Sequence, residues 1–195
     1  MQTSVQFHEQ AEFLRESSGS NIETTLRKAV KVLARFRIPH YVCGGFAVQE
    51  HGYPRYTQDV DIIVPDVGLA YDTLCMNGFL ESPGATVIDP ETRVKVDLLP
   101  AGQKLDWGPL LLPVPTTVSE EPQVLTLEAL IDSKLSAYIG RGIERVQDYA
   151  DVVELIKANQ LPRDYGLDEG VRDLYQRIWD ELQANRLRGT PHKME

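Results

Sequence analysis

The sequence predicts an α/β half followed by an all-helical half. Over residues 20–125, short β-branched runs alternate with segments whose apolar residues recur at helical spacing. From Thr126 onward the apolar residues follow helical spacing alone. We therefore expect an α/β core over residues 20–125 and a helical subdomain over residues 126–188. Residues 1–19 are expected to form a tail or a short helix, and residues 189–195 a polar tail.

The first elements of the core surround a glycine pair. Apolar residues at helical spacing predict a helix that begins near Ile22 and ends before Pro39. Residues 41–65 then read YVCGGFAVQEHGYPRYTQDVDIIVP, which predicts a strand, a glycine turn, a short helix and a β-branched strand stopped by Pro65. Glycine lets the backbone turn sharply, so bare amide groups can approach an anion there.

Two aspartates on the β-branched strand predict a metal site. Side chains alternate along a strand, so Asp59 and Asp61 point to one face, with Cα atoms roughly 6.6 Å apart. Unpaired carboxylates this close repel each other unless cations neutralise them. Mg²⁺ prefers carboxylate and phosphate oxygens, and two such ions can clamp the attacking and leaving oxygens of a phosphoryl-type displacement.

The rest of the core supplies a third carboxylate. The pattern predicts a second helix over residues 69–76, a short strand at Phe79, and a hairpin of residues 86–88 and 94–99. Asp97 is the one acid inside the second hairpin strand, and we expect a neighbouring strand to bring it to the shared metal site.

A loop and three helices complete the chain. Residues 100–123 are rich in proline and glycine, which predicts an irregular excursion with one or two edge strands. Trp107 in this excursion and Trp179 are expected to be packing anchors, with stacking on a base as the alternative for Trp107. One helix is expected from the Thr126 cap to a break at residues 140–142, a second from Ile143 to Asn159, and a third over residues 167–187.

Composition limits the classes of partner and the cellular location that we expect. A net charge of -9 argues against a protein that coats nucleic acid through a broad basic surface, although a local patch could still hold an RNA end. Cys43 and Cys75 make neither a disulfide framework nor a metal-binding spacing. No stretch has the apolar length needed to span a membrane, so we expect a cytoplasmic protein with no membrane partner.

These residues resemble a known superfamily. The glycine pair after an apolar strand, the Asp-x-Asp strand and the distant strand aspartate resemble the nucleotidyltransferase superfamily typified by DNA polymerase beta. The stretch is also similar to small bacterial nucleotidyltransferase-like proteins, including AbiEii-type toxins, in which an Arg-x-Thr-x-Asp-x-Asp run is usual. Arg55 and Thr57 complete that run here. Where that group usually has a basic residue before its terminal Asp-x-x-Asp, this chain has Gln147.

The resemblance implies a small mixed β-sheet packed on helices and transfer of a nucleoside monophosphate from a nucleoside triphosphate (NTP) to an acceptor hydroxyl. It implies two Mg²⁺ ions, with Mn²⁺ as the alternative metal. The implied catalytic and metal-binding residues are Asp59, Asp61 and Asp97. The implied nucleotide-binding residues are Gly44, Gly45, Arg55, Thr57 and Lys134.

The acceptor and the role stay open at this point. The acceptor is an RNA end or tRNA, a protein side chain, or a small molecule such as an antibiotic, and a toxin-like role with a cognate antitoxin or partner protein is one option. The alternative is a non-catalytic nucleotide- or partner-binding module that retains the fold. A metal-dependent phosphohydrolase is a weaker option. Such an enzyme would need histidine among its metal ligands, and only His40 and His51 lie near the stretch of residues 41–65.

Overall fold

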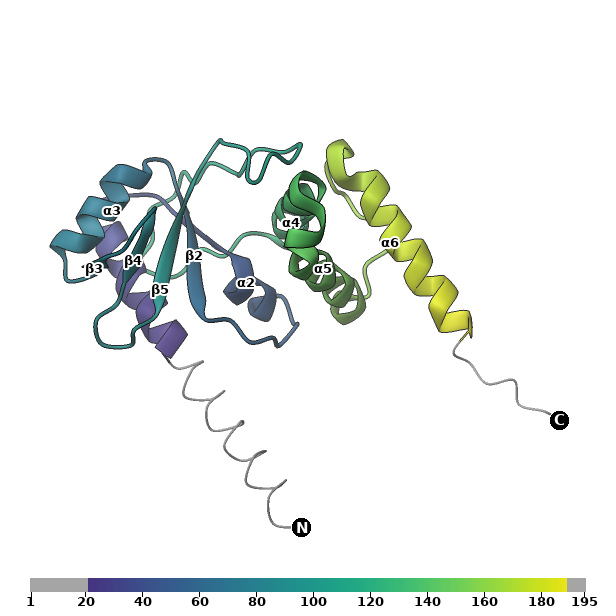
Figure 1. Cartoon of the computed structure of the whole chain (residues 1–195), viewed down its shortest axis with the longest axis horizontal. Coiled ribbons are helices and arrows are strands. Elements are labelled where there is room, and N and C mark those ends of the chain that lie inside the picture. Colours follow the sequence, from purple (N-terminus) through teal and green to yellow (C-terminus); the bar gives the residue numbers. More distant parts are fainter. Residues whose placement is uncertain (1–20, 189–195) are drawn as a thin grey trace, which may run out of the picture. The chain divides into compact units, whose positions relative to one another are not determined.

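The computed structural model describes residues 21–188 and divides them into two compact units (Figure 1). The tails expected over residues 1–19 and 189–195 lie outside the described residues. The first unit holds residues 21–50, 54–102 and 113–125, and the second holds residues 51–53, 103–112 and 126–188.

The first unit is built on a five-stranded mixed sheet, as predicted. Its strand order is β1-β2-β5-β4-β3, in which β2 and β5 pair in parallel and every other pairing is antiparallel. The strands are β1 (Tyr41–Cys43), β2 (Asp59–Val64), β3 (Leu80–Glu81), β4 (Thr86–Ile88) and β5 (Lys95–Pro100). The predicted Asp-x-Asp strand and the predicted hairpin are both present.

One face of this sheet carries the apolar core. Val60 and Ile62 of β2 and Val96 of β5 are fully buried, in one cluster with apolar residues of the helix over residues 21–35 and of α3 (Val67–Met76). Because side chains alternate along a strand, the aspartates between these residues point to the opposite face. The core therefore fixes the side of the sheet on which the carboxylates stand.

The proline-rich excursion forms an isolated antiparallel bridge between Lys104 and Leu111 instead of the one or two expected edge strands, and a second isolated bridge follows it. Val124 pairs with Val42 of β1 through an isolated parallel bridge, and the amide of Val42 donates to the carbonyl of Gln123 at 2.7 Å. Frequent prolines remove the amide donors that a longer ladder would need.

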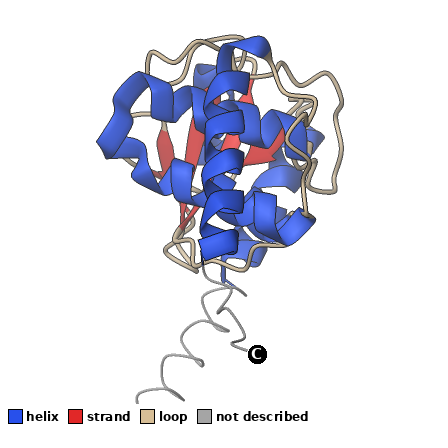
Figure 2. Ribbon diagram, turned by 90° about the vertical axis from the view of Figure 1, so that its right-hand side faces the viewer, coloured by secondary structure: helices blue, strands red, loops and turns tan. Residues whose placement is uncertain are grey.

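The second unit contains three α-helices in its described part, and the named strands belong to the first unit. Figure 2 draws the helices in blue and the strands in red. The helical elements are α4 (Leu127–Arg141), the 3₁₀ turn η1 (Gly142–Arg145), α5 (Val146–Asn159) and α6 (Glu169–Arg188). The break expected at residues 140–142 is confirmed, because α4 ends at Arg141 and its C-cap Gly142 has φ +56°. The next helix begins at Val146 and not at Ile143 as expected, because η1 occupies the residues between them. No helix in the described range combines the length and apolar character needed to cross a membrane.

Candidate active site

The parallel pairing of β2 with β5 brings the three aspartates to one face of the sheet. In its register Asp61 lies directly opposite Asp97, and Asp59 lies opposite Lys95. Neighbouring strands are about 4.8 Å apart, so the carboxylates of Asp61 and Asp97 share a small area. All three aspartates are half-buried. We call this area, defined by Asp59, Asp61 and Asp97, the carboxylate face.

Threonine hydroxyls hold two of these carboxylates. Thr57 Oγ1 donates to Asp59 Oδ1 at 3.1 Å, and Thr86 Oγ1 donates to Asp97 Oδ1 at 2.5 Å. Thr57 is 6% exposed, so the residue implied to bind nucleotide is engaged with Asp59. Thr86 was not predicted as a site residue. Its contact with Asp97 depends on the register between β4 and β5, and the sequence of the loop that joins these strands does not indicate that register.

The glycine pair packs directly against the carboxylate face. Gly44 has φ +62°, and a Cβ placed on it would stand 1.7 Å from Asp61 Oδ2. A Cβ on Gly45 would stand 2.5 Å from Thr57 Oγ1 and 2.8 Å from Arg55 Nη2. The pair begins helix α2 (Gly44–Glu50) instead of preceding it as expected. Both glycines are therefore required by close approach, and Gly44 also by its backbone conformation.

The Arg55 guanidinium is held beside the glycine pair. Its Nη1 donates to the Tyr56 carbonyl at 2.9 Å, while its Nη2 is the atom that faces Gly45. The Gln49 amide of α2 donates to the Arg55 carbonyl and so ties the backbone of this loop to the helix. A cation and two bare glycines thus stand next to the aspartates.

Lys134 lies in the second unit, within a buried ion-pair cluster. Its Nζ is 2.8 Å from Asp148 Oδ1 and 2.7 Å from Asp151 Oδ2, and the residue is 5% exposed. Burial opposes the charged ammonium, but the two carboxylates outweigh it and raise the pKa of Lys134 above its ordinary value. We call these three residues the Lys134 triad. Gln147, where a basic residue was expected, donates its amide to Asp151 at 2.9 Å. A nucleotide role for Lys134 stays a prediction.

The carboxylate face has the right atoms for Mg²⁺ but is not a complete protein cage. Among residues 21–188, no three His, Cys, Asp or Glu side chains gather around a point where they could hold one ion. Mg²⁺ is commonly held by one or two carboxylates together with substrate phosphate oxygens. The donor set therefore fits an ion whose shell is completed by a phosphate-bearing substrate.

Comparison with known proteins establishes the fold. No family model matches the chain, and no curated protein matches it. A crystal structure of an antigenic nucleotidyltransferase-like protein from Paracoccidioides brasiliensis matches with a TM-score of 0.52 and 16% identity, over 88% of this chain and 91% of that chain. This match and the mixed five-stranded sheet show a nucleotidyltransferase fold, as predicted.

Two structures of the antibiotic-resistance factor ANT(2'')-Ia also match, each with a TM-score of 0.47. The solution structure is 13% identical and covers 85% of this chain and 95% of its own. The crystal structure, a complex with adenylyl-2''-tobramycin, is 15% identical and covers 80% of this chain and 97% of its own.

Proposed function

We propose that the protein is a Mg²⁺-dependent nucleotidyltransferase. In the proposed reaction an acceptor hydroxyl oxygen attacks the α-phosphorus of an NTP. The bond from that phosphorus to the bridging oxygen breaks, pyrophosphate leaves, and the acceptor keeps the nucleoside monophosphate. The nucleotidyltransferase fold is compatible with this reaction, but the residues of the site carry the argument.

A single observation carries the proposal: Gly44 and the paired aspartates Asp61 and Asp97 converge at one place. Gly44 stands so close to the Asp61 carboxylate that no side chain fits between them. The strand register sets Asp97 opposite Asp61. Carboxylates gathered on one face offer the oxygen ligands that Mg²⁺ prefers, and a fold without chemistry has no need to gather them.

Each group has a role that follows from its chemistry. Asp59 and Asp61 would hold the metal, which supplies charge neutralisation for the phosphates and for the attacking oxygen. Asp97 would complete a metal site and accept the proton of the acceptor hydroxyl. The amides of the glycine pair and the Arg55 guanidinium would bind phosphate oxygens, the guanidinium through a bidentate fork.

The hydroxyl bonds support this division of roles. A carboxylate oxygen that already accepts from a threonine is fixed in direction, which leaves the second oxygen for a metal or a proton. Thr57 fixes Asp59 in this way, and Thr86 fixes Asp97. Ordered carboxylates lower the cost of assembling a reactive complex.

The experiment that tests the proposal is a transfer assay. The purified protein is incubated with Mg²⁺ and each NTP carrying a radioactive α-phosphate, with total tRNA, cell extract and a panel of antibiotics as acceptors. We expect label on one acceptor class with the wild type and none with Asp59→Ala. The matched control is Asp72→Ala on the exposed side of α3, which is expected to transfer label at the wild-type rate.

The acceptor found in this assay decides the finer role. Label on tRNA or another RNA end would support the toxin-like role that the Arg55-to-Asp61 run suggests. Label on an antibiotic would support a resistance role. Absence of transfer together with absence of metal-dependent NTP binding would contradict the proposal and leave a non-catalytic module that retains the fold.

A further inference from the structure

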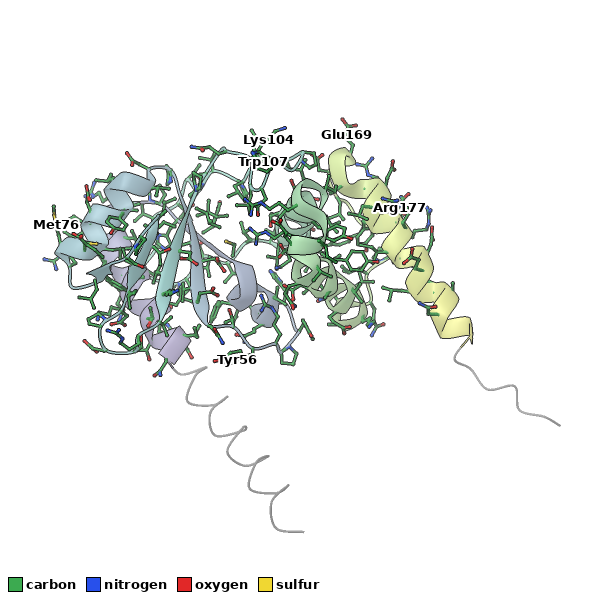
Figure 3. All side chains as sticks on the ribbon, viewed as in Figure 1. Tyr56, Met76, Lys104, Trp107, Glu169 and Arg177 are labelled. Carbon is green, nitrogen blue, oxygen red and sulfur yellow. The ribbon has the colours of Figure 1, made fainter. Side chains whose placement is uncertain are left out.

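Trp107 is an exposed aromatic side chain that the proposed reaction does not use. The residue is 83% exposed, so its predicted role as a packing anchor is wrong (Figure 3). The chain's other tryptophan behaves as predicted, because the Trp179 indole donates to the Leu161 carbonyl at 2.9 Å in a partly buried position. Leaving a whole indole in water forfeits a large burial energy, so its exposure calls for a reason.

Ion pairs hold the loop that presents Trp107. Asp106 and Trp107 both have left-handed backbones, with φ of +55° and +60°, which residues other than glycine rarely adopt. The Asp106 carboxylate pairs with Arg145 and, at 2.9 Å, with Arg141. A strained backbone persists only where its surroundings fix it, and these bonds fix it here.

Two glycines seat the same loop, residues 103–112, on the backbone of α4. A Cβ on Gly140 would stand 1.8 Å from the Asp106 carbonyl oxygen, and a Cβ on Gly108 would stand 2.1 Å from the Ser136 carbonyl oxygen. The Leu110 amide also donates to Ser136 Oγ at 3.0 Å. The indole is therefore carried on a rigid support and not on a loose loop.

The surroundings of the indole select a flat, anionic ligand. The Arg141 guanidinium lies 5.5 Å from the centre of the Trp107 ring, so a planar cation already borders the aromatic face. The Arg141 and Arg145 side chains remain 42% and 37% exposed, and Lys104 of the same loop is exposed. A cationic aminosugar would meet like charge at this place, whereas a nucleobase that carries phosphate would find stacking and charge neutralisation together.

We propose that Trp107 and Arg141 form a stacking platform for an unpaired nucleobase. The base comes either from a single-stranded RNA end or from a free nucleotide. The first source would name RNA as the acceptor class and so rests on the proposed function, whereas binding at the platform itself needs no transfer chemistry.

A protein partner is the rival occupant. Exposed Ile139 near the end of α4, Ile143 in η1 and Val146 at the start of α5 are aliphatic, and an aliphatic surface suits a protein better than a base. We favour the nucleobase because the most exposed large group of the loop is a flat indole bordered by guanidinium groups. The rival predicts that Ile143 matters for binding, and the platform predicts that it does not.

Tryptophan fluorescence tests the platform directly, because a stacked base quenches indole emission. In a Trp179→Phe background Trp107 is the sole tryptophan of the chain. We expect saturable quenching by a short adenylate oligoribonucleotide or by ATP and none by an aminoglycoside. Quenching by the oligoribonucleotide identifies an RNA base, and quenching by ATP alone identifies the base of a free nucleotide.

Affinity measurements on full-length variants complete the test. Anisotropy of the labelled oligoribonucleotide, or displacement of labelled ATP, is expected to show roughly five- to hundred-fold weaker binding for Trp107→Leu and weaker binding for Arg141→Lys. The exposed control Ile143→Ser is expected to bind as the wild type does. Equal affinity in Trp107→Leu, absence of quenching by either probe, or an Ile143→Ser loss as large as that of Trp107→Leu would each overturn the platform. If the protein shows no transfer activity but still shows Trp107-dependent quenching, the proposed nucleotidyltransferase function is wrong and the stacking platform stands.

Discussion

Replacing Gly44 by alanine tests whether the glycine pair and the aspartates form one tightly packed site. The added methyl group meets two costs, since Gly44 has φ +62° and its Cβ would stand 1.7 Å from Asp61 Oδ2. A left-handed backbone costs an L residue about 1–2 kcal/mol. Overpacking typically costs about 1–3 kcal/mol, so Gly44→Ala should lower the free energy of unfolding by about 2–5 kcal/mol.

Urea unfolding followed by circular dichroism measures this loss, and Gly84 supplies the matched control. Gly84 also has a positive φ, of +78°, but no atom lies within 4 Å of its added Cβ. Gly84→Ala should therefore lose only the backbone part, about 1–2 kcal/mol. The difference between the two variants isolates the contact with Asp61.

A double mutant identifies the partner of the clash. Asp61→Ala removes the Oδ2 and Cγ atoms, at 1.7 and 2.5 Å from the added Cβ, and keeps only the Asp61 Cβ, at 2.9 Å. In its presence Gly44→Ala should therefore cost at least about 1 kcal/mol less than it does alone. Equal losses in Gly44→Ala and Gly84→Ala, or no relief in the double mutant, would refute the close packing of Gly44 on Asp61.

Three further outcomes are expected. Thr86→Val removes the hydroxyl that orients Asp97 and should lower the transfer rate roughly ten- to hundred-fold while the urea midpoint changes little, as a rate assay beside an unfolding curve would show. Lys134→Met removes the cation that pairs with the buried Asp151 and with the half-buried Asp148, which keeps a longer contact with Arg145 at 3.7 Å. The variant should lower the free energy of unfolding by about 3–5 kcal/mol, whereas a loss under 1 kcal/mol by urea titration would contradict a structural role for the Lys134 triad. His40 is fully buried, and burial lowers its pKa below the ordinary 6.5, so the unfolded chain binds the extra proton. Stability should fall as pH drops below about 6.5, by at most about 1.4 kcal/mol per pH unit from this group, and His40→Leu should show a shallower slope in unfolding midpoints measured across that range.

The strand that carries the carboxylates was predictable because its signals are local. The β-branched run from Val60 to Val64 and the stop at Pro65 mark β2, and alternation along the strand sets Asp59 and Asp61 on one face. The glycine pair was recognisable for the same reason, as it directly follows a short apolar strand.

Asp97 was expected on a neighbouring strand, but the strand register and the hydrogen-bond partners of these residues were not predictable, because they depend on packing between distant segments. Nothing in residues 95–100 states that β5 pairs in parallel with β2, or that Thr86 faces Asp97. Lys134 was expected to bind nucleotide, and its burial follows from the packing of α5 on α4. The spacing of Asp148 and Asp151 was the one available signal for this ion pair.

The exposure of Trp107 was likewise not predictable from the sequence. A tryptophan in a proline- and glycine-rich loop usually packs inward, and its exposure follows from Gly108 and Gly140, which let the loop backbone lie flat on α4. The sequence does not tell a glycine that is required by close packing, as Gly108 and Gly140 are, from one that only permits a turn.

The central claim is that the carboxylate face binds a metal–nucleotide complex, and calorimetry with a non-hydrolysable NTP analogue tests it without any knowledge of the acceptor. The account predicts binding by the wild type and by the exposed control Asp72→Asn when Mg²⁺ is present, and loss of binding when Mg²⁺ is chelated or in Asp61→Asn. Binding by Asp61→Asn with wild-type affinity, or wild-type binding that is indifferent to Mg²⁺, would contradict it.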